Sequence, residues 1–443
     1  MHWTYGSPVS SVGSMDSAHT DDDRPRAGTS AYRRTVVAMV AVAVATFAQL
    51  WSVQPVLPEL AEDLGESAAR VSLTVSAATG ALAGFALVWS GLGDRFGRTR
   101  VIAVSLAVAT LVGCAAPFAG DLWLLVALRA VQGAALGGVP AAAVAHLSEV
   151  LHPADAARAI GVYIAGNPLG GMGGRLVSGW AAAAGGWQWG VAASTAVGVL
   201  AWLVFVCALP RRTRGAPRSG AGGVGGRSRW RAALATPGMA ALYAQALLLM
   251  GAFMTVYNLL GFRLTGEPFG LSQAVASSLF VAYTAGMAGS AWSGRGAGRW
   301  GPYRVLAVSV AVMGAAAAVL AVPWLPVVAV GLVVFTFVFF CAHATASAWA
   351  ARRAGEGRAQ ASSVYTLAYY VGASVLGWAG GLFYDRWGWG AALVFAGFLC
   401  ASALVAGLGL RPGKEVLPGA GVSLTGTGSG AGERGGGRPP KVV

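Results

Sequence analysis

A charged turn between two apolar segments carries the clearest chemical pattern in the sequence. Residues 91–100 read GLGDRFGRTR, which sets the carboxylate of Asp94 beside Arg95 and Arg98 around the small residue Gly97. An acid at a helix end can accept hydrogen bonds from backbone N–H groups and from arginines. We therefore expect a polar latch at this turn, with an ordinary neutralised loop carboxylate as the alternative.

A weaker copy of this turn follows 204 positions later. Residues 298–304 read GRWGPYR, which keeps a basic residue at Arg299 and a glycine at Gly301. A glycine, Gly298, stands where the first turn has Asp94. If the two turns act as the gates of the two halves, these gates are therefore expected to be unequal. At the same offset Gln54 falls on Asn258. A repeat of this kind indicates two related halves with a solute site between them.

Two arginines, Arg129 and Arg175, stand inside long apolar segments. A charge within hydrocarbon is costly and normally faces a cavity or a partner. For Arg129 the alternative is a side chain that extends to the outer interface. For Arg175 helix packing is as reasonable as ligand binding, because small residues surround it and let helices approach closely. The glycines expected to serve this packing are Gly133, Gly170, Gly171, Gly173 and Gly174.

Proton transfer inside a membrane usually needs a carboxylate or a histidine that titrates. None of the 17 acidic residues is expected at mid-membrane, which leaves His146 and His343. Imidazole changes charge near physiological pH, and we favour His343; a plain hydrogen bond to a neighbouring helix is the alternative. Other polar or aromatic side chains are expected to line a solute path or to join helices. These are Gln54, Gln132, Asn167, Tyr257, Asn258, Tyr369 and Tyr370.

The composition indicates a chain that faces lipid. Of the 443 residues 56% are hydrophobic and only 11% are charged, whereas soluble domains carry about 25% charged residues. The net charge of +14 does not indicate a nucleic-acid partner, because the arginines fall in short gaps between apolar segments instead of along one face. The four cysteines lie inside apolar segments without CxxC spacing, so we expect no metal site or disulfide.

Twelve apolar segments have the length of about 20 residues that a bilayer core requires. The sequence therefore predicts an all-α integral membrane protein with 12 transmembrane helices in two pseudo-symmetric six-helix bundles. The segments are expected at 35–57, 71–92, 101–119, 122–147, 158–182, 188–210, 238–261, 273–294, 305–322, 325–350, 361–381 and 388–410.

The distribution of charge predicts both the orientation and the domains. With both termini in the cytoplasm, 26 of the 31 Lys and Arg residues fall in inner loops and tails, as the positive-inside rule requires. We expect bundles at 35–210 and 238–410, joined by an Arg-rich cytoplasmic linker at 211–237 that also has the composition to contact anionic lipid. Residues 1–34 and 411–443 are expected to be disordered cytoplasmic tails.

Several motifs resemble the major facilitator superfamily (MFS). Residues 90–100 are similar to the family's loop between helices two and three, Gly-x-x-x-Asp-Arg-x-Gly-Arg-Arg, except that a serine replaces the first glycine. Residues 129–133 resemble Arg-x-x-Gln-Gly of its fourth helix, and 166–174 resemble the Gly-Pro-rich fifth-helix motif of its antiporters with altered spacing. The phrases WSVQPVLPEL, AHATASAWAARRA and YYVGASVLGWAGGLFYDRWGW resemble bacterial sugar or drug efflux proton antiporters.

The resemblance implies a monomeric transporter of the bacterial inner membrane that exports a small organic solute against protons. Its two bundles would rock about a central site, with the proton gradient as driving force and no cofactor. In the family, the network around Asp94 latches the halves in the outward-open state, and Arg129 takes part in proton coupling or anion contact.

Three alternatives stay open. An uncoupled uniporter or an importer fits the missing mid-membrane carboxylate, and a non-transporting sensor or scaffold of the same fold is the second. A membrane enzyme is the third, but the sequence contains no HExxH and no convincing Ser/His/Asp set. Neither of its two lysines is followed by the Ser or Thr of a P-loop, which excludes an ATP-driven pump. We therefore expect no enzymatic activity.

Overall fold

The computed structural model describes residues 24–209 and 226–410. In these residues all regular structure is helical. Most of the two expected tails and of the linker therefore lies outside the described residues. Two parts of them are described. Helix α1 begins at Ser30, because Thr29 caps it by accepting a hydrogen bond from the backbone N–H of Tyr32. Within the expected linker, residues 226–235 form a helix.

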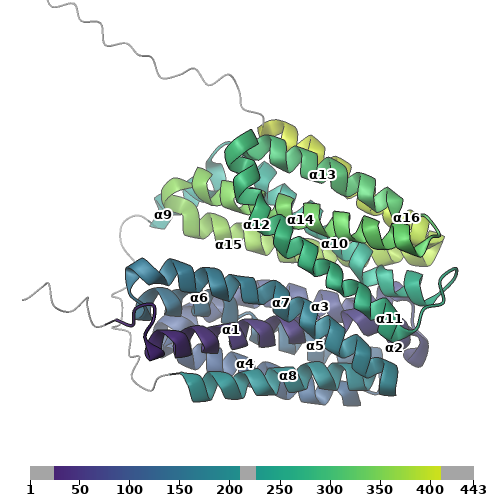
Figure 1. The fold of residues 1–443 in the computed structure, drawn as a ribbon, viewed down its shortest axis with the longest axis horizontal. Coiled ribbons are helices and arrows are strands. Elements are labelled where there is room, and N and C mark those ends of the chain that lie inside the picture. The colour runs from purple at the N-terminus through teal and green to yellow at the C-terminus, as the bar shows by residue number, and fades with distance from the viewer. Residues whose placement is uncertain (1–23, 210–225, 411–443) are drawn as a thin grey trace, which may run out of the picture. The chain divides into compact units, whose positions relative to one another are not determined.

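The first half of the chain folds into eight helices, coloured purple to teal in Figure 1. They are α1 (Ser30–Leu50), α2 (Leu57–Leu64), α3 (Ala68–Phe96), α4 (Arg98–Ala115), α5 (Leu122–Leu136), α6 (Val139–Val150), α7 (Pro153–Gly185) and α8 (Trp187–Ala208). A short 3-10 turn, η1 (Gln54–Val56), follows α1.

The second half repeats the pattern, coloured from teal through green to yellow. Its helices are α9 (Gly226–Ala235), α10 (Met239–Thr265), α11 (Gln273–Ser278), α12 (Tyr283–Trp300), α13 (Pro302–Val319), α14 (Leu325–Arg353), α15 (Arg358–Val371) and α16 (Gly377–Gly407). A 3-10 turn, η3 (Leu279–Ala282), joins α11 to α12, and a π-helical turn, η5 (Gly372–Leu376), joins α15 to α16.

These helices supply the twelve expected crossings. Nine of the described segments are long and apolar enough to cross a membrane, and one of them, 355–410, runs through a sharp break at Gly388 (φ 78°, ψ −170°) that divides it into two crossings. The remaining crossings are α3 and α7, helices of 29 and 33 residues. Helices α5 and α6 share one crossing, as do α11 and α12.

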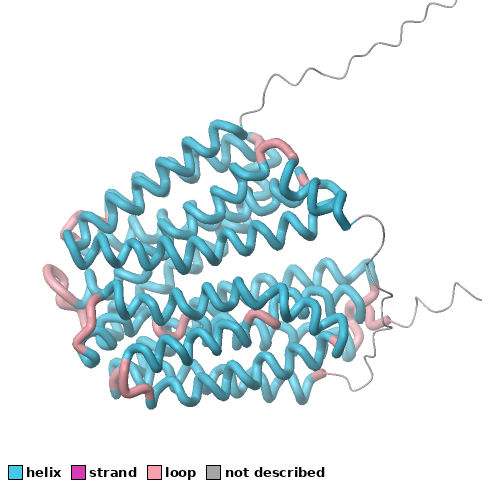
Figure 2. Tube along the Cα trace, turned by 180° about the vertical axis from the view of Figure 1, so that it is seen from behind, coloured by secondary structure: helices cyan, strands magenta, loops and turns pink. Residues whose placement is uncertain are grey.

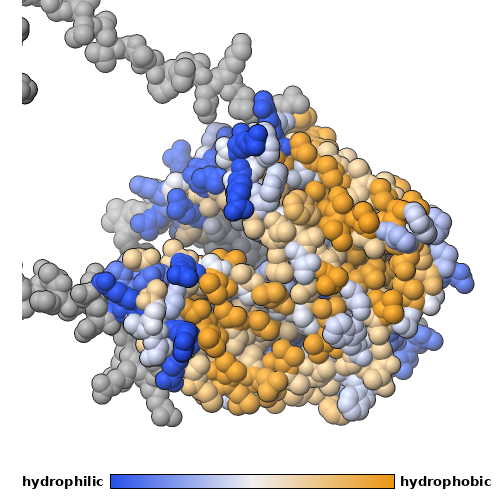
Figure 3. All heavy atoms as spheres, viewed as in Figure 1, coloured by the Kyte–Doolittle hydropathy of each residue, from blue (hydrophilic) through white to orange (hydrophobic). Residues whose placement is uncertain are grey.

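Two bundles result. In the first, α1 packs against α7 and α8, and α3 packs against α5; in the second, α10 packs against α16, and α14 packs against α12 and α13. The two bundles lie one above the other in Figure 1, and Figure 2 shows the same arrangement from behind. Large apolar side chains such as Phe118 and Val394 are 85% and 74% exposed. Figure 3 shows an apolar belt between two ends that carry polar residues, which are denser at one of them. An exposed apolar surface of this extent is typical of contact with lipid.

Candidate functional site

The two ends of the bundles differ in charge. We call the basic end the one that carries the turns at Gly97 and Gly301, together with loops 151–152 and 354–357. The opposite end carries loops 51–56, 266–272 and the break at Gly388.

The two halves are joined by hydrogen bonds near the opposite end. The backbone N–H of Ala69 donates to Asp385 Oδ2 at 3.1 Å, and Gln273 Nε2 donates to the carbonyl of Pro55 at 2.6 Å. Deeper in the molecule, Ser76 and Ser374 each donate a hydroxyl to the other's carbonyl, at 2.7 and 2.8 Å. Toward the basic end Figure 3 shows the surface indented between the polar groups of the two halves.

Gln54 and Asn258, which the 204-residue repeat predicts to be equivalent, contact each other directly. Gln54 Nε2 donates to Asn258 Oδ1 at 2.6 Å, and both side chains are buried. Equivalent positions of two parallel repeats meet only near the axis that relates the halves. The pair therefore marks the centre of the molecule, just inside the opposite end, where hydrogen bonds join the two halves.

Arg175 lies beside this pair. Its Nε donates to Gln54 Oε1 at 2.5 Å, and its Nη1 donates to the carbonyl of Gly171 at 2.8 Å. Its guanidinium is 4.7 Å from the ring centroid of Trp51 and 4.6 Å from that of Tyr283. The side chain is 1% exposed, so a full positive charge lies between the two halves.

Arg129 is placed differently, inside the first bundle. It donates to the carbonyls of Gln49, Leu50 and Thr74 and to Gln132 Oε1, and it is 0% exposed. Because α1 ends at Leu50, its last carbonyls have no partner within the helix, and Arg129 supplies one. The side chain does not extend to an interface, and it holds the end of α1 against α3 and α5.

Gln132, expected on the solute path, completes this network. Its Nε2 donates to Gln49 Oε1 at 3.2 Å and to the carbonyl of Ala109 at 3.1 Å. Gly133 faces α3 so closely that a Cβ there would lie 2.0 Å from the carbonyl oxygen of Ala78. These contacts place both residues in the packing of the first bundle.

His343 belongs to an aromatic group in the second bundle. The hydroxyl of Tyr365 is 3.3 Å from His343 Nδ1, and the ring centroid of Tyr369 is 4.7 Å from that of the imidazole. Tyr370 packs edge-on against Tyr369 with 5.2 Å between centroids. The hydroxyl of Tyr257 pairs with Thr336 Oγ1 at 2.6 Å, and its ring lies 5.1 Å from that of Tyr283, which contacts Arg175.

The remaining candidates are His146, Asn167 and the glycines of α7, of which Gly171 contacts Arg175. His146 is buried in the first bundle with Nε2 unpartnered, and Asn167 has a buried Oδ1 without a donor. Of the expected packing glycines on α7, Gly170 and Gly174 would place a Cβ within 2.6 and 2.4 Å of the backbone of α1. Gly171 faces Arg175 Nη1 at 3.1 Å. Gly173 differs from the expectation, because nothing lies within 4 Å of the position of its Cβ.

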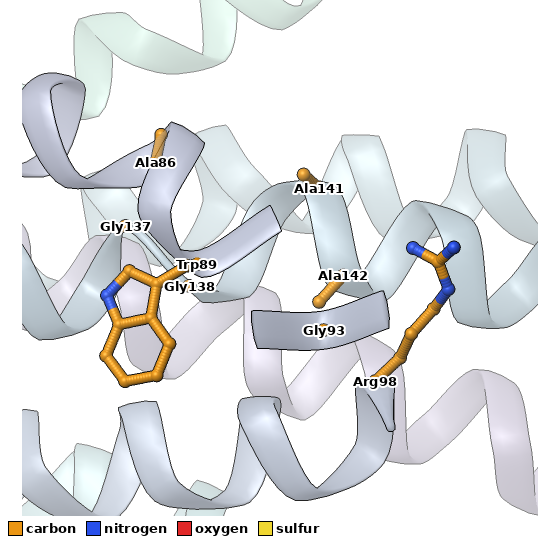
Figure 4. A pocket seen from close by; sticks show the side chains of 8 residues that line it. All are labelled: Ala86, Trp89, Gly93, Arg98, Gly137, Gly138, Ala141 and Ala142. Carbon is orange, nitrogen blue, oxygen red and sulfur yellow. The ribbon is translucent and has the colours of Figure 1, made fainter. Parts of the chain in front are cut away.

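The first gate lies on the basic end. Arg98 donates from Nη2 to Asp94 Oδ1 at 3.1 Å and from Nε to Glu149 Oε1 at 2.8 Å. Gly97 has φ 91°, a conformation that favours glycine. Arg95 extends over the ring of Phe96 at 5.3 Å. Figure 4 shows Trp89 and Arg98 on either side of small residues from α3 and α6, where a cavity of only about 10 Å³ remains.

The turn at Gly301 has a larger cavity beside it than the turn at Gly97. Gly301 repeats the left-handed turn with φ 81°, and Arg299 covers the ring of Trp300 at 5.0 Å. Ser293 stands where the repeat has Trp89 in the first half. The smaller side chain leaves a cavity of about 280 Å³ beside Ser293, Gly298 and Arg352.

Sequence reasoning missed the aromatic surroundings of Arg175. In the sequence, ordinary apolar positions are all that one sees at Trp51, Phe280 and Tyr283. Glu149 was expected only as a carboxylate at the membrane rim. No local pattern links these residues to the arginines that they contact, because those arginines lie far along the chain. In residues 24–209 and 226–410, His, Cys, Asp and Glu form no group of three that could hold a metal ion.

The chain is similar to known transporters along most of its length. The family described as Major Facilitator Superfamily matches residues 39–377. The uncharacterized MFS-type transporter YybF of Bacillus subtilis (strain 168) is 33% identical over 364 residues, which cover 82% of this chain and 90% of YybF. The inner membrane transport protein YnfM of Escherichia coli (strain K12) is 33% identical over 387 residues, 87% of this chain and 92% of YnfM.

The fold is similar to a solved structure as well. The crystal structure of the nucleoside transporter NupG superimposes with a TM-score of 0.68 at 15% identity, covering 86% of this chain and 100% of NupG. The match of the family to more than three hundred consecutive residues, the two relatives and the paired helical bundles agree. This chain therefore belongs to the major facilitator superfamily and is a multi-pass membrane transporter.

Proposed function

We propose that this transporter exports a small organic solute in exchange for protons, by rocking residues 35–210 against residues 238–410. The observation that carries the proposal is the position of the bonds between the halves. They lie toward one end, at Ala69–Asp385, Gln273–Pro55 and Ser76–Ser374. Two halves that close at one end around a buried central site are the arrangement that alternating access requires.

The charge distribution supports an orientation for this movement. The basic end carries Arg98, Arg299 and Arg352, and the positive-inside rule assigns such an end to the cytoplasm. The conformation is then inward-open, with both termini cytoplasmic in a bacterial inner membrane. We propose that the chain acts as a monomer, with the proton gradient as its driving force and no cofactor.

An uncoupled uniporter or importer is the second candidate. In the described residues the acidic side chains stand at or near helix ends, such as Asp94, Glu149 and Asp155, so the interior offers no carboxylate to carry a proton. Export by proton exchange is favoured instead by the motif resemblance of residues 166–174 and by His343, a titratable group within the second bundle.

A screen of solute accumulation in cells that overproduce the chain tests the proposal. Export predicts lower accumulation of at least one solute than in cells with an empty vector, and an uncoupler should remove the difference. Higher accumulation in the producing cells would indicate an importer. A difference that survives the uncoupler would exclude proton coupling.

The latch at Asp94 gives a conformational prediction. In this conformation Asp94 is 69% exposed and bonded to Arg98 of its own half, so any bond that it makes to the other half belongs to the outward-open state. Asp94→Asn should therefore shift the population toward inward-open. In a background without native cysteines, labelling of Ser277→Cys at the opposite end should fall, and labelling of Ala297→Cys at the basic end should rise. Glu356→Gln, an exposed acid of the same end, is the control; equal labelling in Asp94→Asn and wild type would exclude the latch.

The role of His343 is tested by the pH dependence of flux. If its imidazole carries the proton, His343→Ala in proteoliposomes should leave a flux that no longer changes between about pH 5.5 and 8, the range in which imidazole titrates. His146→Gln, a histidine buried in the other bundle, should keep the wild-type profile. A His343→Ala profile with the wild-type midpoint would remove this residue as the proton carrier.

A further inference from the structure

We propose that Arg175 binds the carboxylate of a small organic anion whose aromatic or apolar body lies against rings from both halves. The proposal rests on the transport function proposed above and names its substrate class. Trp51 and Gln54 come from the first half, and Phe280, Tyr283 and Asn258 come from the second, so the site lies where a substrate must sit to move with both.

The first argument is an unmet hydrogen bond. Nε and Nη1 of Arg175 have acceptors, but Nη2 is buried and has none. A buried donor without an acceptor costs about 1–3 kcal/mol, and more when it is charged. A site that retains such a donor is suited to an acceptor that comes from outside the chain.

The second argument is the direction of the hydrogen bonds around it. A guanidinium only donates, so Gln54 must turn Oε1 to Arg175 and Nε2 to Asn258. Asn258 then accepts with Oδ1, which leaves its Nδ2 buried without a partner. The hydrogen-bonded series Arg175–Gln54–Asn258 thus has an unused donor at each end, Nη2 of Arg175 and Nδ2 of Asn258. A ligand that completes it must supply acceptors, which a carboxylate does.

The third argument is charge. The ion pairs Arg70–Glu66, Arg98–Asp94 and Arg98–Glu149 lie near the ends of the bundles. Among the described residues, no carboxylate forms an ion pair with Arg175, so none of them neutralises its charge. Ionisable groups within a membrane are costly and usually serve a partner or a substrate.

Arg129 shows what a purely structural arginine looks like in this protein. It is buried to the same degree, but every nitrogen of its guanidinium donates to a carbonyl or amide oxygen of the first bundle. None of its nitrogen atoms is left buried without an acceptor. Arg175 is not satisfied in this way, because its Nη2 has no acceptor.

The surrounding rings fit the body of such an anion. Trp51, Tyr283 and Phe280 lie 4.7, 4.6 and 5.5 Å from the guanidinium carbon. Rings over the faces of a guanidinium leave its N–H edge for a planar carboxylate. In this conformation the rings close around Nη2, so we expect the anion to bind once Phe280 and Tyr283, which move with the second half, have shifted.

The test uses matched ligands on the purified full chain in lipid nanodiscs. Two series are compared, benzoate with benzamide and benzylamine, and cinnamate with cinnamamide and cinnamylamine. We expect the carboxylate of at least one series to raise the melting temperature while its amide and amine do not. Arg175→Gln should weaken carboxylate binding about tenfold or more, Arg175→Lys should weaken it less, and Arg263→Gln, which removes an arginine stacked on Phe269, should not change it.

Each other outcome overturns the proposal. These outcomes are no carboxylate binding in either series, an amide or amine that binds as well as its acid, or wild-type carboxylate affinity in Arg175→Gln. If Arg175→Gln does not fold, the proposal is overturned when two results occur together. Arg175→Lys then binds the carboxylate as tightly as wild type, and wild type binds the acid and the amide equally. Failure here with solute export intact leaves the proposed function standing, whereas carboxylate binding without any flux overturns that function instead.

Discussion

Replacing Arg129 with leucine is expected to lower the melting temperature of the protein by about 10 °C or to prevent folding. The variant replaces the guanidinium with a shorter apolar side chain and leaves two buried acceptors, the carbonyl of Leu50 and Gln132 Oε1, without the arginine that donates to them. Each buried acceptor that loses its partner costs about 1–3 kcal/mol, and about 3 kcal/mol shifts the melting temperature of a unit of this size by about 6–12 °C. Size-exclusion chromatography of a fluorescent fusion after heating measures the shift.

Two controls separate this structural role from proton coupling. Arg263→Leu removes an arginine that donates to one loop carbonyl, that of Glu267, and should melt near wild type. Arg129→Lys keeps the charge but has one donor group where the guanidinium has three, so it should melt between wild type and Arg129→Leu. The structural role is contradicted if Arg129→Leu melts within about 2 °C of wild type. Wild-type melting with lost pH-dependent flux in Arg129→Lys would favour proton coupling.

The membrane architecture could be predicted from the sequence because it depends on local composition. Runs of about 20 apolar residues and the positions of the arginines indicate the crossings, and the break at Gly388 falls where the last segment was expected to begin. The turns at Gly97 and Gly301 were also visible, since both need the left-handed backbone that favours glycine. The domain boundaries at the linker and tails stay predictions, because most of those residues lie outside the described ranges.

The central site was only partly predictable, because its contacts join residues far apart in the chain. The repeat pointed to Gln54 and Asn258, and their hydrogen bond spans 204 positions. No pattern in the sequence linked Arg175 to Tyr283 across the two halves, because a tyrosine near a helix start reads as an interfacial or core residue. The same limit applies to Arg129, whose partners are mostly backbone carbonyls, and these have no signature in a sequence.

The two neighbouring glycines Gly173 and Gly174 provide the second large effect with its own control. A Cβ at Gly174 would lie 2.4 Å from Ala48 Cα and 2.6 Å from its carbonyl oxygen, whereas a Cβ at Gly173 meets nothing within 4 Å. Gly174→Ala must therefore push α7 away from α1, at a cost of about 1–3 kcal/mol. Gly173→Ala should instead stabilise the helix by up to about 1 kcal/mol.

The expected result is a gap of about 5–10 °C between the melting temperatures of the two variants. Both exchanges add one methyl group to adjacent positions of α7, so helix propensity and hydropathy change equally, and only the contact with Ala48 differs. Moving α7 away from α1 also separates Arg175, one residue further along, from Gln54 on η1. Gly174→Ala should therefore reduce solute flux in the fraction that folds, while Gly173→Ala keeps it. Equal melting of the two variants would show that α7 and α1 do not pack as closely as these distances require.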